Sequence, residues 1–202
     1  DRVERPWRVF QEEWSRMFAS LTSYVEAEEV TFGRVMRFAG PVDLSDTPVL
    51  EIEAEKGRYW RAVAFDYYGG RGWASTYEEM GRLGEGASPI APPPYALREP
   101  LEQTVRVLFP STYSIVAAPQ LIDVNIAAEA LLLYLPRGTA TAARPPVDIE
   151  MAYAQYRLRA GDVYEAVSSI SVADEDSLRA ASTEYPDWVR RRFLQLPEGL
   201  PE

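Results

Sequence analysis

The side chains that most often carry enzyme chemistry are missing from this chain. Its 202 residues include no Cys and no His. This excludes a thiolate nucleophile, an imidazole base, a Ser-His-Asp triad, and the thiolate or imidazole ligands of zinc and iron sites. Any activity must therefore rest on carboxylates, or on Ser or Thr assisted by the single Lys56, or be absent.

Two pairs of closely spaced aspartates are the first candidates, because a glycosidase needs two carboxyl groups beside its substrate. Asp43 and Asp46 flank a predicted turn, and Asp174 and Asp176 lie at the start of a predicted helix. Aspartates in turns cap backbone amides, and aspartates in a first helical turn complement the helix dipole. We therefore favour structural roles for both pairs. Neither pair has the ligand spacing of an EF-hand, so calcium binding at these aspartates stays an open alternative that no motif supports.

Lys56 lies in a predicted hairpin turn, which favours a solubilising role over a Ser-Lys dyad.

The densest group of aromatic and polar side chains interrupts a predicted strand. It contains Asp66, Tyr67, Tyr68, Arg71 and Trp73, interleaved with glycines. Aromatic faces stack on sugar rings, and the two charged groups can hydrogen-bond hydroxyls, so these five residues are a candidate ligand or interface surface. A strand end, a tight glycine turn and a Trp folded back onto the domain explain the same residues. We favour this structural interpretation, because aromatic side chains most often contribute to cores.

A run of three arginines, Arg190, Arg191 and Arg192, lies near the end of the chain. Basic clusters that bind anionic lipids usually contain about four to eight Lys or Arg residues, so three are too few for such a site. We interpret the triplet as a solvated helix end, where cations complement the dipole. Its position also allows an inter-domain contact, which we keep as a hypothesis.

The overall charge argues against nucleic-acid binding. The chain has 21 basic and 31 acidic residues, a formal net charge of -10 at pH 7, and this field repels a polyanion. With 47% hydrophobic residues, its length suits one large domain or two small ones. No apolar stretch is long enough to span a membrane as a helix. Because the first residue is Asp1, we expect a fragment of a longer protein.

Hydrophobic periodicity divides the chain into three segments. Residues 1–28 are predicted to form an amphipathic helix, either docked on the domain or juxtamembrane, residues 29–173 a β-rich domain, and residues 174–202 a helical segment. The predicted strands cover 49–55, 59–68, 102–108, 114–118, 130–135, 149–159 and 163–172, with loops at 81–100 and 138–146, and helices at 174–181 and 187–196. Short strands between turn signals indicate a mainly β fold, an antiparallel β sandwich or open barrel.

Five sequence blocks stand in an order that resembles a known family. They are LSDTPVL at 44–50, YWRA at 59–62, FDYYGGRGW at 65–73, YPDW at 185–188 and FLQLP at 193–197, with weaker likeness at 102–103 and 164–169. Together they resemble bacterial membrane-anchored transglutaminase-like proteins. The resemblance implies N-terminal membrane helices, an extracytoplasmic β-rich region, a papain-like Cys-His-Asp core and a last membrane helix. This chain resembles the β-rich region alone, and no residue here inherits a catalytic role.

From the resemblance we expect a non-catalytic extracytoplasmic domain that positions a transglutaminase-like core at the bacterial cell membrane and contributes to substrate recognition. Its partners would be that core, the membrane helices, and a peptide, protein or cell-wall substrate. No cofactor, metal or nucleic acid is expected. Two alternatives stay open: a carbohydrate- or peptidoglycan-binding module that uses the surface from Tyr67 to Trp73, and a carboxylate-dependent hydrolase. A protein-interaction module would also leave no sequence signature.

Overall fold

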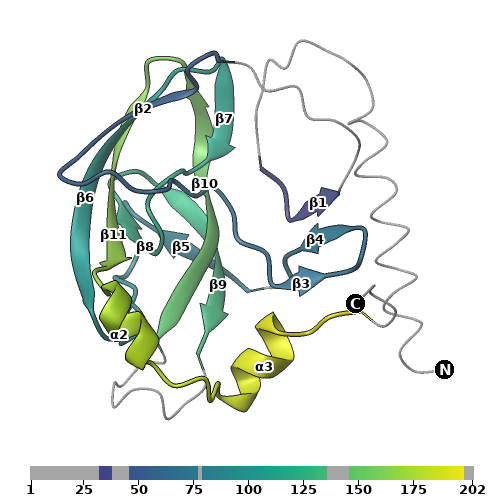
Figure 1. Cartoon of the computed structure of the whole chain (residues 1–202). Helices are drawn as coiled ribbons and strands as arrows, with labels where there is room; N and C mark the ends of the chain where they lie inside the picture. Colours follow the sequence, from purple (N-terminus) through teal and green to yellow (C-terminus); the bar gives the residue numbers. More distant parts are fainter. Residues whose placement is uncertain (1–31, 38–45, 77–78, 136–145, 198–202) are drawn as a thin grey trace.

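The computed structural model describes residues 32–37, 46–76, 79–135 and 146–197, which form three antiparallel sheets and two short helices (Figure 1). The small sheet has the order β1-β4-β3, with β1 Val35–Arg37, β4 Gly72–Ala74 and β3 Tyr67–Tyr68. The second sheet has the order β5-β9-β10-β7, with β5 Met80–Leu83, β9 Ala128–Tyr134, β10 Val147–Arg159 and β7 Ser111–Ser114. The third has the order β2-β6-β11-β8, with β2 Leu50–Ala54, β6 Arg98–Val107, β11 Val163–Ser171 and β8 Leu121–Val124. The helices are α2 Glu175–Ala180 and α3 Asp187–Phe193. The prediction of a mainly β, antiparallel fold is confirmed.

The main hydrophobic core lies between the two four-stranded sheets. Val105 and Val107 of β6 are fully buried together with Ile149 and Ala152 of β10 and the ring of Tyr164 of β11. Side chains on a strand alternate between its faces, so each sheet contributes one apolar face to this layer. The described strands form a sandwich-like arrangement and no closed barrel.

A short inserted segment, residues 60–66, enters the sandwich between the chain that follows β7 and strand β10. Arg61 forms an isolated bridge with Ala117, and Val63 forms another with Met151 of β10. The predicted strand over 59–68 is therefore wrong for most of its length, because only its last two residues pair as a strand, in β3. The predicted hairpin at Lys56 is also wrong, since β2 pairs with β6.

A glycine explains one strand that the sequence pattern did not indicate. β5 falls partly within the predicted loop over 81–100, and the sequence pattern did not indicate a strand there because Gly81 interrupts the apolar alternation. A Cβ atom at Gly81 would lie 2.3 Å from Cδ1 of Leu132, so any larger residue at this position of β5 would have to displace the Leu132 side chain of β9. Strand β8 was also not predicted.

The C-terminal helices agree with the sequence pattern at their starts. The Asp174 carboxylate accepts the backbone N–H of Ser177 at 2.8 Å and caps α2 as predicted. Helix α3 begins at Asp187 as predicted and ends at Phe193, before the predicted end at 196. The predicted N-terminal helix lies outside the described residues.

Two glycines in the turn after β5 provide a matched stability test. Both have left-handed φ angles, +78° at Gly84 and +75° at Gly86. A Cβ at Gly84 would meet the carbonyl oxygen of Ile126 at 2.0 Å, whereas a Cβ at Gly86 meets nothing within 4 Å. Gly86→Ala should cost about 1 kcal/mol of unfolding free energy from backbone strain, and Gly84→Ala about 3 kcal/mol or more. Urea unfolding measures both, and equal losses would contradict the packing described here.

Candidate functional site

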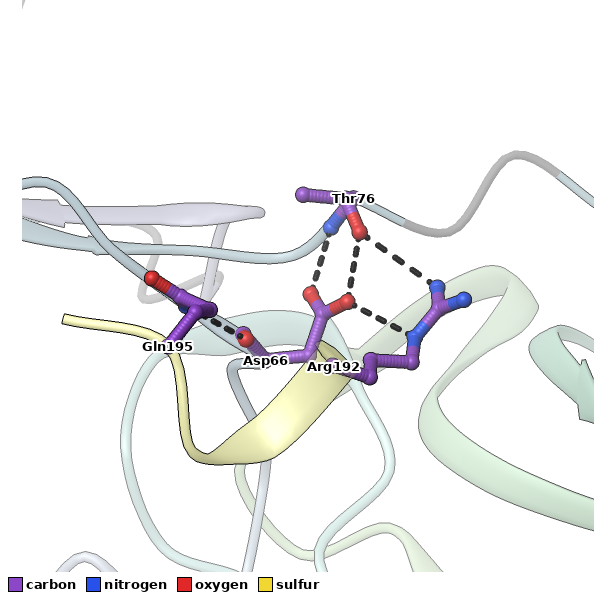
Figure 2. Close-up of polar contacts among 4 residues, drawn as sticks. All are labelled: Asp66, Thr76, Arg192 and Gln195. Atoms are coloured by element: carbon purple, nitrogen blue, oxygen red, sulfur yellow. Dashed lines mark hydrogen bonds and ion pairs between the residues drawn. The ribbon is translucent and has the colours of Figure 1, made fainter. Parts of the chain in front are cut away.

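Asp66, the last residue of the inserted segment, is a buried acid that is only 3% exposed. Its backbone N–H donates to the carbonyl of Ala74 at 3.1 Å, and the N–H of Ala64 donates to the carbonyl of Glu150 at 3.0 Å. These two bonds attach the segment to the small sheet on one side and to β10 on the other. The backbone of Asp66 is therefore fixed, with its carboxylate directed toward Thr76 and α3 (Figure 2).

The Asp66 carboxylate is satisfied by three donors, which Figure 2 shows together. Oδ1 accepts the backbone N–H of Thr76 at 2.7 Å, while Oδ2 accepts the Thr76 hydroxyl and the Nε–H of Arg192 at 2.9 Å. Arg192 Nη2 also donates to Thr76 Oγ1 at 3.3 Å, and Gln195 Nε2 donates to the Asp66 carbonyl at 3.2 Å. We call these four residues the Asp66 clamp.

The clamp holds helix α3 against the sandwich. The Asp66 side chain is 1% exposed and that of Arg192 is 33% exposed, so the ion pair lies at the edge of the buried region. Trp188 of α3 adds apolar contact, since it packs on a cluster that contains Leu133 and Met151 on the outer face of the second sheet. Removal of one partner from a buried ion pair is strongly destabilising, because the other charge stays buried without compensation.

The five residues of the predicted aromatic surface do not form one exposed surface in the structure. Tyr68 and Trp73 face each other across β3 and β4, with ring centroids 4.9 Å apart. Both rings and that of Tyr67 are half-buried, while Arg71 is exposed. The Asp66 carboxylate is engaged by the clamp, so it does not present free oxygens to a ligand beside Arg71.

The arginine triplet is also divided. Arg192 belongs to the clamp, and Arg190 donates from Nε to the carbonyl of Tyr185 at 3.2 Å. Arg191 is exposed and lines a cavity beside the clamp. Two candidates that sequence reasoning treated separately, Asp66 and Arg192, are thus brought into direct contact, 126 positions apart in the chain.

The cavity beside α3, which we call the α3 cavity, has a volume of about 390 Å³. This volume falls within the range of small-molecule sites. Its lining comes from the clamp, from the end of β9, from β3 and from α3: Asp66, Tyr67, Thr76, Leu133, Tyr134, Trp188, Arg191, Arg192 and Gln195. Sequence reasoning missed the contributions of Tyr134, Trp188 and Gln195, because they join the site only through tertiary packing.

Two further acids on β10, Asp148 and Glu150, were also missed. Gln120 Nε2 donates to Asp148 Oδ2 at 2.7 Å, and Arg61 donates to the backbone carbonyl of Ile149 at 2.9 Å. Burial raises the pKa of Asp148. Burial, and then the negative charge of Asp148, raise the pKa of Glu150 to about 7, against the opposing influence of Arg61.

A β-bulge explains why the sequence pattern did not place Glu150 inside. Simple alternation along 149–154 would turn Ile149 and Met151 to the same face. In the structure Ile149 pairs with Leu132 and Met151 with Leu131, so Glu150 is an extra residue between them. The bulge sends Ile149 into the main core and Met151 to the outer face, and it leaves Glu150 only 5% exposed.

The geometry around these acids does not suit hydrolysis. The space beside Glu150 measures about 10 Å³, room for about one water molecule rather than a substrate.

Of the predicted carboxylate pairs, Asp174 caps α2 and Asp43 lies outside the described residues. Lys56 forms an ion pair with Glu99. Among the described residues, no group of three acidic side chains could hold a metal ion.

Comparisons with protein-family models, with curated proteins and with solved structures find no match to this chain. Within the described part of the chain, no helix has both the length and the apolar character that crossing a membrane requires.

The raised pKa of Glu150 predicts a stability effect that depends on pH. Its ordinary pKa is 4.5 and its folded value is about 7, so between these values the folded protein binds more protons than the unfolded chain. Stability from this group is therefore complete below pH 4.5, falls as the pH rises, and levels off above about pH 7. Relative to Glu150→Gln, the unmodified chain should lose about 1–3 kcal/mol of unfolding free energy across this range.

Urea unfolding at several pH values measures the difference. Glu165→Gln is the matched control, because it makes the same substitution at a position that is exposed on β11. A constant difference between Glu150→Gln and the unmodified chain at all pH values would contradict the buried environment described for Glu150.

Proposed function

We propose that this chain is a non-catalytic positioning module, in which the β sandwich holds α3, and whatever protein segment follows it, in one fixed orientation. The observation that carries the proposal is the Asp66 clamp. A helix of seven residues is too short to be stable alone in water, so its direction must come from tertiary contacts. Here those contacts are an ion pair, two hydrogen bonds and the packing of Trp188.

The proposed partner is a transglutaminase-like catalytic core, on the extracytoplasmic side of a bacterial membrane. Support comes from where the resembling sequence blocks meet in space. Asp66 belongs to the block at 65–73, Trp188 to the block at 185–188 and Gln195 to the block at 193–197. Through the hydrogen bond from Gln195 to Asp66, two blocks more than a hundred positions apart contribute to the Asp66 clamp, and Trp188 from a third block packs on the same sandwich. A positioned core would gain from such a platform, because catalysis depends on reacting groups held in a fixed geometry.

The absence of cysteine makes the positioning role directly measurable, since two labelling sites can be introduced without removing any native thiol. Spin labels on Val163→Cys and Leu196→Cys report the distance from β11 to the segment that follows α3 and carries Gln195 of the clamp, and both labelled positions are exposed, by 43% and 70%. The unmodified clamp should give one narrow distance distribution. Asp66→Asn, which keeps the shape but removes the charge that holds Arg192, should broaden it.

Glu175→Gln is the matched control for this experiment. It removes the exposed ion pair between Glu175 and Arg179 on α2. Surface ion pairs of this kind contribute little to the free energy of folding. A broad distribution in the unmodified chain, or one that Asp66→Asn leaves narrow, would contradict the proposed role of the clamp.

The catalytic partner is tested separately, in a protein in which a transglutaminase-like core follows this chain. Asp66→Asn should lower kcat/KM for amide substrates about tenfold by misplacing the core, whereas Glu175→Gln should not. Equal activities, together with a broadened label distance, would retain the clamp and reject its influence on a catalytic core.

A further inference from the structure

We propose that the α3 cavity is a binding site for a saccharide that carries a carboxylate group, with Arg191 as the carboxylate ligand and Tyr134 and Trp188 as stacking surfaces. The site shares Trp188 with the docking of α3, whereas its carboxylate ligand Arg191 and the ring of Tyr134 do not form the clamp. Its three residues come from the end of β9 and from α3.

Several polar groups in the α3 cavity are not engaged by any described residue. The hydroxyl groups of Tyr67 and Tyr134, the indole N–H of Trp188 and the guanidinium of Arg191 form no hydrogen bond or ion pair within the described part of the chain. None of them is among the buried polar atoms without a partner, so they face accessible space. Four such groups around one cavity of about 390 Å³ are available to a ligand.

Hydrogen-bond donors outnumber acceptors among these free groups of the α3 cavity. The guanidinium and indole groups only donate, and the tyrosine hydroxyls do both. The single carboxylate of the cavity, Asp66, is already satisfied by Thr76 and Arg192. Arg191 therefore supplies a positive charge that no acid in the lining neutralises. One guanidinium matches one carboxylate through two parallel hydrogen bonds, so a ligand with one carboxylate fits this charge.

The aromatic rings of the α3 cavity suit the body of a sugar ligand. Three aromatic rings, those of Tyr67, Tyr134 and Trp188, stand beside hydroxyl and amide groups in the same cavity. A sugar ring presents C–H faces to aromatic rings and hydroxyl groups at its edge, so it matches this combination. Recognition of a peptide usually depends on backbone groups of a strand edge or on apolar pockets for side chains. The polar groups in this lining are side chains, which favours the saccharide.

The test is an NMR titration of the indole N–H signal of Trp188, one of five Trp residues in the chain, assigned with Trp188→Phe. Sodium glucuronate should shift this signal with a dissociation constant of about 1–10 mM, as expected for a single sugar ring. Glucose, which lacks the carboxylate, should bind about tenfold more weakly. The peptide-like carboxylate acetyl-Ala-Ala should bind weakly as well, because it lacks a sugar ring.

Two variants test the assignment of residues. Arg191→Ala should weaken glucuronate binding about tenfold and abolish the preference over glucose. Tyr134→Ala should weaken both sugars, because an aromatic face is lost. Arg71→Ala is the matched control, since it removes the same charge from an exposed position outside the cavity and should leave binding unchanged.

The outcomes are separable from those of the clamp experiment. The spin-label distance between β11 and α3 should stay narrow in Arg191→Ala and Tyr134→Ala, which shows that the helix is still docked when binding is lost. No shift with glucuronate in a chain whose α3 is docked overturns the proposal. Equal shifts with acetyl-Ala-Ala also overturn it, in favour of a peptide carboxylate site.

Discussion

The structure depends on the need to neutralise one buried carboxylate. A charged group removed from water is costly unless donors surround it, and Asp66 is almost completely enclosed. Its donors come from two places far apart in the chain, Thr76 just after β4 and Arg192 on α3. The inserted segment, the small sheet and the last helix therefore have to meet at one point. The orientation of α3, and the cavity beside it, follow from this requirement.

The two faces of the second sheet are stabilised by different physics. The inner face packs apolar side chains such as Ile149 and Leu132 against the third sheet, so its contribution is the burial of hydrophobic area. The outer face carries an apolar patch around Met151, on which Trp188 of α3 packs. The neighbouring residue Glu150 is buried at the bulge, and burial raises its pKa, as it does that of Asp148. The stability of β10 is therefore expected to depend on pH.

Several elements follow directly from local patterns. Leu50, Ile52 and Ala54 alternate with exposed glutamates in β2, and long apolar alternation marks β10 and β11. Local patterns failed where the backbone departs from simple alternation. The pattern did not indicate β5, because Gly81 breaks the apolar alternation. What Gly81 accommodates is a close contact with Leu132 on another strand, which no local pattern contains. The aromatic segment 59–68 was predicted to be a strand, yet Arg61 and Val63 form only isolated bridges and only Tyr67–Tyr68 pair as a strand, in β3.

The residue types and their alternation set the chemistry that is absent and the kind of fold. Without Cys or His, neither thiolate nor imidazole chemistry can occur, and the residue alternation requires sheets with one buried face. Which polar groups meet depends on the tertiary structure. Nothing local links Asp66 to Arg192, or places Tyr134 and Trp188 in one cavity, because these arrangements depend on strand order, on the bulge at Glu150 and on where α3 docks. Long-range pairing is a property of the whole folded chain, so it leaves no periodic signal in any one segment.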